Sequence, residues 1–277
     1  MRIDSHQHYW NLKQCDFYWD SPKLPSILRG PYGPRDLAPS LKKYRIDKTV
    51  VVQAADNTAE TDFLLDLAHR TPSIAGVVGW LDMEALGFAR QFARYRRNKK
   101  FIGIRPMFQD RPAADMLRPQ MIESLKVVAE QDFPFDILVY AHQLPCALKM
   151  LDRVPKLRAV VDHIAKPVIR ERKMQPWKKH MAEVAAHPNV YCKISGMVTE
   201  ADLKTWTVDD LRPYVEHAVE CFGLNRVMFG SDWPVCLLAG NYDRVINALQ
   251  QILKLHLNAA TERAVFGGNA ARFYKIK

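Results

Sequence analysis

Short apolar runs alternate with longer amphipathic segments along the whole chain. The runs are rich in β-branched and aromatic residues and are apolar at nearly every position, as in Thr49-Val-Val-Val-Gln53. Such continuity is typical of parallel strands that are covered on both faces. The pattern predicts strands at Ile3–Tyr9, Lys48–Ala54, Ile74–Leu81, Phe101–Met107, Phe135–Ala141, Leu157–His163, Val190–Ser195 and Val227–Ser231.

The segments between these runs have helical periodicity. In the segment that starts at Glu60, apolar residues recur at Phe63, Leu64, Leu67 and Ala68, which places them on one helical face. Thr207-Val-Asp-Asp supplies capping chemistry before another helix. The predicted helices are Glu60–Arg70, Gln120–Gln131, Gln143–Val154, Trp177–Ala186, Leu211–Phe222, Asn241–Leu257 and Thr261–Tyr274.

This alternation predicts an α/β fold, a (β/α)8 TIM barrel that forms a single domain over residues 1–277. The chain length alone would allow one or two domains. An open doubly wound sheet is the alternative, but no glycine-rich nucleotide motif follows any strand. The long irregular segment from Trp10 to Arg35 follows the first strand, where a barrel carries an active-site loop.

In such a barrel the carboxyl ends of the strands meet at the active site, so the residues there are the candidates for chemistry. His6 and His8 have period-two spacing and leave the strand on the same side, although this pair alone does not establish a metal site. Asp232 ends an apolar strand, where a carboxylate must be paired or functional, with a helix N-cap as the alternative. His163, which ends the sixth strand, is another candidate for a functional residue. The alternative is that it is a buried histidine whose hydrogen bonds only stabilise the core. The other strand-end candidates are Arg105, Tyr140, His142 and Trp80.

Longer motifs carry a resemblance that spans nearly the whole chain. They include Ile3-Asp-Ser-His-Gln-His-Tyr-Trp, Gly103-Ile-Arg-Pro-Met-Phe-Gln-Asp, Asp162-His-Ile-Ala-Lys-Pro, Phe229-Gly-Ser-Asp-Trp-Pro and Phe266-Gly-Gly-Asn-Ala-Ala-Arg-Phe-Tyr. With these motifs the chain resembles the amidohydrolase superfamily, in its amidohydrolase 2 group. The match is to the sugar-lactonase branch, which contains L-fuconolactonases and L-rhamnonolactonases.

The resemblance implies hydrolysis of an aldonolactone to the open aldonic acid, in carbohydrate metabolism. Asp232 is the expected general base for the attacking water. His163 and the pair His6 and His8, or a metal that they hold, are expected to stabilise the oxyanion. The expected substrate-binding residues are Arg105 for the carbonyl or a ring hydroxyl, His142 or Tyr140 for the leaving oxygen, and Trp10, Trp80 and Trp233 as flat faces for a sugar ring. Simple packing is the alternative for each tryptophan.

The resemblance leaves the cofactor open. In one alternative, His6, His8 and Asp232 would hold one divalent ion, zinc. In the other, catalysis would need no metal, as the resemblance to metal-independent lactonases of this branch implies. Two metals are disfavoured because strand four ends in Arg105-Pro106 rather than in a bridging Lys or Glu. Some relatives carry His in place of Pro106 and Arg in place of His142, so the resemblance does not identify the lactone.

Charge and composition change this interpretation little. The 40 Lys and Arg against 30 Asp and Glu give a formal charge of +10, which slightly favours an anionic substrate or product. The basic residues are scattered and no zinc-finger or RNA-binding motif occurs, so we expect no nucleic-acid partner.

No apolar run reaches about 18 residues and no signal peptide is evident, which predicts no membrane partner. The five cysteines form no CxxC motif, and the chain is expected to be cytoplasmic, with its oligomeric state open.

Three other functions stay open at this point. A pyrone-dicarboxylate or muconolactone-type lactonase would share the HxH pair, the strand-six His and the strand-eight Asp. A decarboxylase on the same barrel is an alternative of another class. A non-catalytic binding protein on a decayed barrel is disfavoured, because His6, His8, His163 and Asp232 are all present.

Overall fold

The computed structural model describes residues 1–12 and 25–277, and its centre is a parallel sheet. Eight strands are hydrogen-bonded in the order in which they occur along the chain. They are β1 (Ile3–Gln7), β2 (Lys48–Val52), β3 (Ile74–Gly79), β4 (Phe101–Ile104), β5 (Phe135–Ile137), β6 (Ala159–Val161), β7 (Val190–Ile194) and β8 (Val227–Phe229). All eight predicted strands are confirmed, each shorter than its apolar run.

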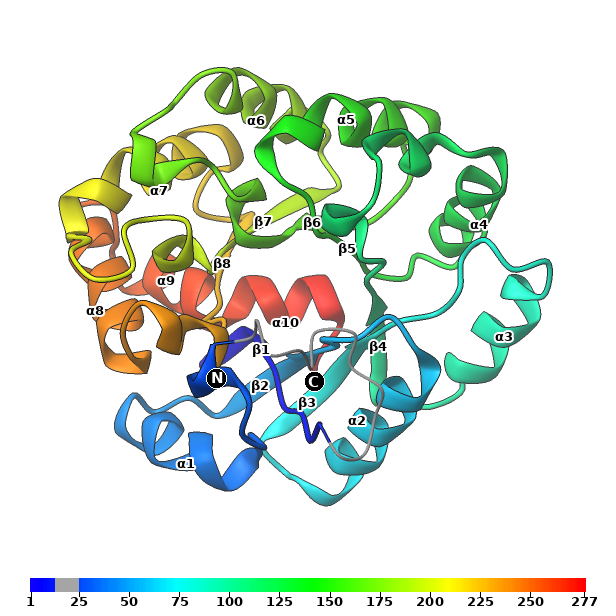
Figure 1. Cartoon of the computed structure of the whole chain (residues 1–277), viewed down its shortest axis with the longest axis horizontal. Coiled ribbons are helices and arrows are strands. Elements are labelled where there is room, and N and C mark those ends of the chain that lie inside the picture. The colour runs from blue at the N-terminus through cyan, green and yellow to red at the C-terminus, as the bar shows by residue number, and fades with distance from the viewer. Residues whose placement is uncertain (13–24) are drawn as a thin grey trace.

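The two outer strands of this sheet meet and close it into a barrel. Just beyond β1 and β8, the His8 main-chain N–H donates to the Trp233 carbonyl at 2.7 Å, and the Asp232 N–H donates to the His6 carbonyl at 2.8 Å. The strands therefore surround a common axis, with helices outside them (Figure 1). This arrangement confirms the predicted (β/α)8 barrel.

Seven of the described helices connect successive strands, as expected for repeated βαβ units, and the last three follow β8. They are α1 (Pro34–Lys43), α2 (Thr58–Arg70), α3 (Phe88–Tyr95), α4 (Pro119–Glu130), α5 (Leu144–Arg153), α6 (Trp177–Ala185), α7 (Val208–Phe222), α8 (Tyr242–Leu253), α9 (Ala259–Arg263) and α10 (Asn269–Tyr274). The capping box predicted at Thr207 starts α7. Within the described residues, no helix is both long and apolar enough to cross a membrane.

The observed helices differ from the predicted ones in three places. The segment expected to form one helix over Thr261–Tyr274 is divided into α9 and α10 by a wide turn at Ala264–Gly268. The turn packs against the start of β1, where a Cβ on Gly267 would lie 2.2 Å from the Met1 carbonyl oxygen. Helices α1 and α3 were not among the predicted helices, although Pro34 at the first position of α1 is a common start signal. Of the predicted active-site loop at 10–35, residues 13–24 lie outside the described residues.

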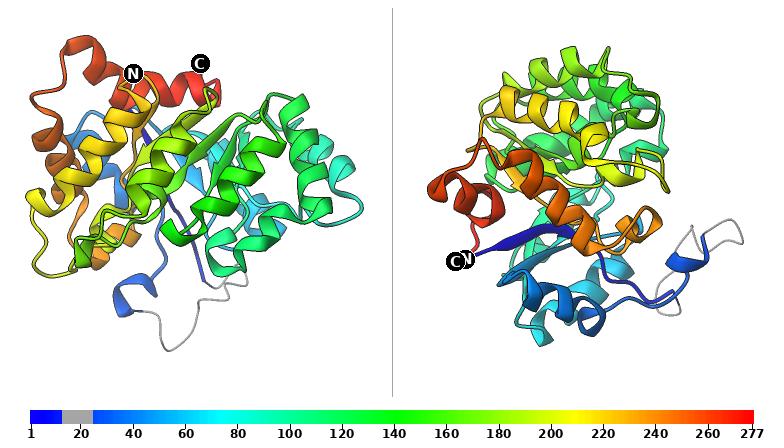
Figure 2. Two further views of the ribbon diagram at one scale, coloured as in Figure 1. Left: turned by 90° about the horizontal axis from the view of Figure 1, so that it is seen from above. Right: turned by 90° about the vertical axis from the view of Figure 1, so that its left-hand side faces the viewer.

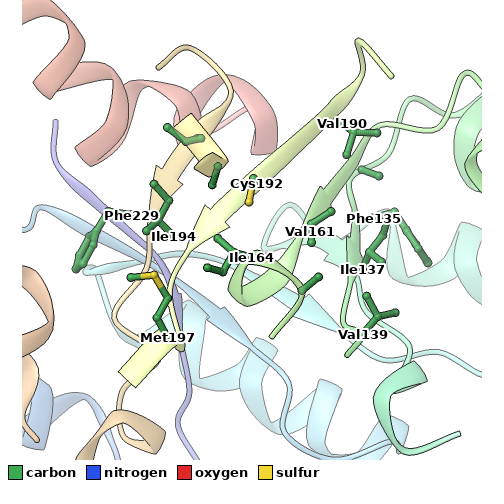
Figure 3. Packing of buried hydrophobic residues seen from close by; sticks show 14 of the residues in the cluster. Phe135, Ile137, Val139, Val161, Ile164, Val190, Cys192, Ile194, Met197 and Phe229 are labelled. Atoms are coloured by element: carbon green, nitrogen blue, oxygen red, sulfur yellow. The ribbon is translucent and has the colours of Figure 1, made fainter. Parts of the chain in front are cut away.

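The core has a layer inside the barrel and a layer between the strands and the helices. Figure 3 shows part of the packing around β5 to β8, including Phe135, Val161 and Phe229. Inside the barrel, Val50 of β2 and Val160 of β6 share a cluster with Phe273 of α10. Helix α10 lies at the same end of the barrel as both termini (Figure 2). Apolar side chains close this end of the barrel. A polar active site is therefore expected at the opposite end, where the strands have their carboxyl ends.

Candidate active site

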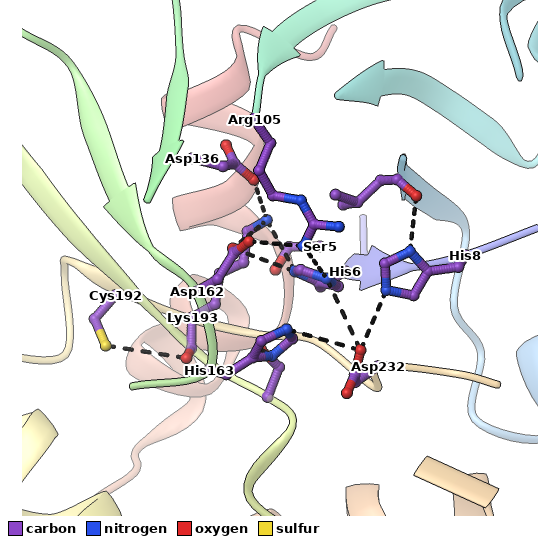
Figure 4. A network of polar contacts seen from close by, with 12 residues as sticks. Ser5, His6, His8, Arg105, Asp136, Asp162, His163, Cys192, Lys193 and Asp232 are labelled. Carbon is purple, nitrogen blue, oxygen red and sulfur yellow. Dashed lines mark hydrogen bonds and ion pairs between the residues drawn. The ribbon is translucent and has the colours of Figure 1, made fainter. Parts of the chain in front are cut away.

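Four of the predicted residues meet at the carboxyl ends of the strands. His6 lies in β1 and His8 directly follows it, while His163 follows β6 and Asp232 follows β8 (Figure 4). The register of β1 on β2 shifts between Asp4 and Gln7, and such bulges re-aim side chains beside active sites. Residues separated by more than 220 positions in the chain are thereby brought into direct contact.

The carboxylate of Asp232 is at the centre of this group. Its Oδ1 lies 3.3 Å from Nε2 of His8, 3.8 Å from Nε2 of His163 and 3.9 Å from Nε2 of His6. Burial raises the pKa of Asp232, but His163, His8 and Lys166 outweigh burial and hold it below its ordinary value of 3.8. Asp232 is therefore an ionised carboxylate at neutral pH, as a general base must be.

The orientation of His8 bears on whether a metal fits. Nδ1 of His8 lies 2.8 Å from the Val52 carbonyl oxygen, which can only accept, so Nδ1 carries the proton. When His8 is neutral, the lone pair of its Nε2 therefore faces the carboxylate oxygen Oδ1 of Asp232 at 3.3 Å. Two acceptors at this distance require a proton, a donor or a cation between them. The ligand atoms of His6, His8 and Asp232 lie within 4.8 Å of one another, and this donor set suits zinc.

A buried ion network lies beneath His6. Nζ of Lys193 in β7 lies 2.5 Å from Asp136 Oδ2, 3.0 Å from Asp162 Oδ1 and 3.2 Å from His6 Nδ1. The Tyr274 hydroxyl of α10 donates to Asp136, whose two carboxylate oxygens lie 2.9 and 2.8 Å from it. Lys193 is 0% exposed, and buried charges are retained only when they are paired. The network therefore connects the closed end of the barrel to the base of the site.

Sequence reasoning did not include Lys193, Asp136 or Asp162 among the site residues. A signal was present, because Asp136 and Lys193 stand inside runs that were predicted to be buried on both faces. A charge in such a run needs a partner of opposite charge. The identity of the partners depends on how the strands are arranged around the barrel, which the sequence pattern alone does not show.

Arg105 follows β4 and lies against both His6 and the ion network. Its Nη1 donates to Asp162 Oδ2 at 3.1 Å and lies 3.4 Å from His6 Nε2, while Nη2 contacts the Gln53 carbonyl oxygen. Burial raises the pKa of Asp162, but Lys193, His6 and Arg105 hold it well below its ordinary range. Much of the hydrogen-bonding capacity of Arg105 is therefore already used within the protein.

His163 begins a strained turn after β6. Residues 163–166 all have positive φ, between 46° and 58°, although none of them is glycine. Such a conformation costs about 1–2 kcal/mol per residue and persists mainly at functional sites. Gly196, with φ of 62°, makes room for the turn, since a Cβ there would lie 2.4 Å from His163 Nδ1. Burial lowers the pKa of His163 well below 6.5, so the ring is neutral at neutral pH.

A cavity of about 290 Å³ opens above these groups. Of the predicted residues, His8, Trp10, Arg105, His163 and Asp232 line it, and His6 lies directly beneath. The described lining does not include Trp80, Tyr140, His142 or Trp233. Trp233 is buried against Tyr9 and Tyr32, and the His142 ring stacks on Tyr140 outside the cavity. Lys166 and Gln109, which were not predicted as site residues, line the same cavity.

Comparisons with known proteins bear on the family of the chain and on its fold. The amidohydrolase family model matches residues 3–276. An L-fucono-1,5-lactonase of Burkholderia ambifaria is 41% identical over 281 residues, which cover 99% of this chain and 96% of the relative. An L-fucono-1,5-lactonase of Burkholderia multivorans is 35% identical over 287 residues, covering 100% and 96%. A solved amidohydrolase structure from B. multivorans with bound zinc is 34% identical, covers 100% of both chains and has a TM-score of 0.94.

Proposed function

Because the chain belongs to the amidohydrolase family, we propose that its site hydrolyses sugar lactones, with L-fucono-1,5-lactone as the first candidate substrate. The observation that carries the hydrolytic chemistry is the ionised Asp232 surrounded by three imidazoles in a closed-ended cavity. The lactone itself is suggested by two full-length relatives named as L-fucono-1,5-lactonases. A cavity of about 290 Å³ has room for one monosaccharide ring.

Asp232 is the proposed base in this reaction. It accepts a proton from water as the water oxygen attacks the lactone carbonyl carbon. When the tetrahedral intermediate collapses, the bond from that carbon to the ring oxygen breaks. Asp232 then returns its proton to the ring oxygen, which becomes a hydroxyl of the open acid. The base is thereby regenerated without a separate general acid.

His163 is the proposed donor to the oxyanion. Ser195 Oγ lies 2.9 Å from His163 Nδ1 and can donate its proton there, which leaves Nε2–H facing Asp232 and the cavity. A neutral imidazole N–H held in this way can bond to the carbonyl oxygen as negative charge develops. The strained turn and Gly196 fix the ring before the substrate arrives, so little reorganisation is needed during the reaction.

His6, His8 and Asp232 are the proposed ligands of one zinc ion. Zinc bound there would supply Lewis-acid polarisation of the carbonyl oxygen. We expect the protein to bind about one zinc ion per chain, and His8→Gln to lose it, because Nε2 is the ring atom facing the other ligands. Equilibrium dialysis followed by metal analysis measures this, with the exposed His69→Gln as the matched control. Equal zinc in the His8 and His69 variants would remove the proposed ligand set.

The protonation states of the site predict a flat pH profile. Asp232 has a pKa below 3.8 and is ionised well before neutral pH, while His163 has a pKa well below 6.5 and is neutral at about pH 6.5 and above. We therefore expect kcat/KM to be nearly constant between about pH 6.5 and 7.5 after subtraction of spontaneous hydrolysis. An acid limb near pH 6.5 that disappears in His163→Gln would contradict these protonation states.

A substrate panel tests the proposed function directly. Purified protein is offered L-fucono-1,5-lactone, an L-rhamnonolactone, a pyrone dicarboxylate and a dihydroxybenzoate, with acid release followed by a pH indicator. We expect turnover of the sugar lactones, and the same assay after chelation shows whether the rate depends on a metal. Turnover of the pyrone alone would identify a dicarboxylate lactonase. Release of CO2 from the benzoate without lactone turnover would identify a decarboxylase.

A further inference from the structure

Lys166 lines the cavity beside Asp232 and His163, and no step of the proposed hydrolysis uses its ammonium group. We propose that Lys166 binds the carboxylate of the open sugar acid as that group forms from the lactone carbonyl; this inference rests on the proposed function. A lactone is neutral, whereas the open acid is ionised at neutral pH. A cation in the cavity therefore has an electrostatic partner in the product that it lacks in the substrate.

The backbone holds Lys166 in a defined relation to the reacting centre. Lys166 is the last residue of the left-handed turn at 163–166, and its main-chain N–H donates to the His163 carbonyl at 2.9 Å. The indole N–H of Trp177 donates to the Ile164 carbonyl at 2.7 Å and ties the turn to α6. One strained element thus presents both the proposed oxyanion donor and the ammonium group to the same cavity. Conformations of this kind persist where a functional arrangement requires them.

The immediate partners of the Lys166 ammonium are neutral. Nζ donates to Gln109 Oε1 at 2.7 Å and lies 5.2 Å from the centre of the Tyr140 ring. Among residues 1–12 and 25–277, no ion pair joins Nζ to a carboxylate within 4.0 Å. Burial raises the pKa of Glu200, and the charge of Lys166 opposes that rise from a greater distance. An ammonium has three donors, so this half-buried group retains the capacity to bind an anion.

Arg105, the other cation that lines the cavity within the described residues, is less suited to this role. It is 2% exposed, its Nη1 pairs with Asp162, and its Nη2 contacts the Gln53 carbonyl. Binding of a product carboxylate by Arg105 would have to compete with a buried ion pair. Lys166 requires no such exchange, because its hydrogen-bond partner is an amide oxygen.

The test compares two open-chain ligands that differ in one group. L-Fuconate carries the carboxylate, and the alditol L-fucitol carries a hydroxymethyl group in its place. Calorimetry is expected to show that the wild-type protein prefers the aldonate by about 10-fold or more, since bonds to charged groups contribute more than neutral ones. Lys166→Met and Lys166→Gln should remove most of this preference, and Lys166→Arg should restore part of it. Lys178→Met, at an exposed position on α6, is the matched control and should keep it.

The outcomes separate this inference from the function on which it rests. Equal wild-type affinity for aldonate and alditol overturns the role of Lys166, and this comparison needs no variant. A preference that survives in both Lys166→Met and Lys166→Gln overturns it as well. Wild-type protein that hydrolyses no sugar lactone overturns the proposed function instead, whatever the two ligands do. Loss of the preference in the variants, with wild-type lactone turnover intact, supports both.

Discussion

Asp232→Asn is expected to lower kcat/KM for the lactone by about 10³-fold or more, because asparagine cannot accept the proton of the attacking water. The side chain keeps its shape, so contacts with the surrounding imidazoles are retained in form. Its backbone has φ of 56°, a conformation that asparagine adopts more readily than most residues. The variant should therefore fold normally, and steady-state kinetics beside thermal unfolding measures both quantities.

The matched control for this variant is Asp66→Asn, which makes the same chemical change at an exposed position on α2. Its kcat/KM and its thermal midpoint should equal those of the wild type. Turnover by Asp232→Asn within about 10-fold of the wild type would remove Asp232 as the base, since positioned general bases typically contribute 10²-fold or more. That result would leave the fold and the family unaffected.

Lys193→Met is expected to lower the free energy of unfolding by about 3–5 kcal/mol, because it leaves Asp136 and Asp162 buried without their shared cation. All three side chains are 0% exposed, so solvent screening does not reduce the effect. Chemical denaturation measures the loss. The exposed Lys178→Met is the control and should change the free energy by no more than about 0.5 kcal/mol.

A second substitution shows whether uncompensated charge is the cause. Adding Asp136→Leu to Lys193→Met removes one of the two stranded carboxylates and should recover part of the lost stability. If adding Asp136→Leu instead lowers the free energy of unfolding further, as an independent core substitution would, the loss in Lys193→Met comes from packing and not from uncompensated charge. If Lys193→Met costs less than about 1 kcal/mol, the network does not stabilise the barrel as described.

The sequence was sufficient for the barrel and for placing His6, His8, His163 and Asp232 at one end of it. A parallel strand that is covered on both faces has an apolar pattern of its own, and eight such runs predict closure. His6, His8, His163 and Asp232 follow from the same pattern, because the carboxyl ends of all strands meet at one end of a barrel. Helices α1 and α3 and the break before α10 were missed. The start of α1 depends on a single proline, and the break depends on the contact of Gly267 with Met1.

Only the tertiary structure decided which polar side chains share the site. Lys193 meets Asp136, Asp162 and His6 because four strands converge, and residues so far apart in the chain have no local spacing that reveals the contact. Local pattern likewise cannot show that Tyr140, His142, Trp80 and Trp233 stay out of the cavity lining. Lys166 enters the cavity through a backbone conformation that its sequence disfavours, and such strain persists only because the packed barrel around it enforces it.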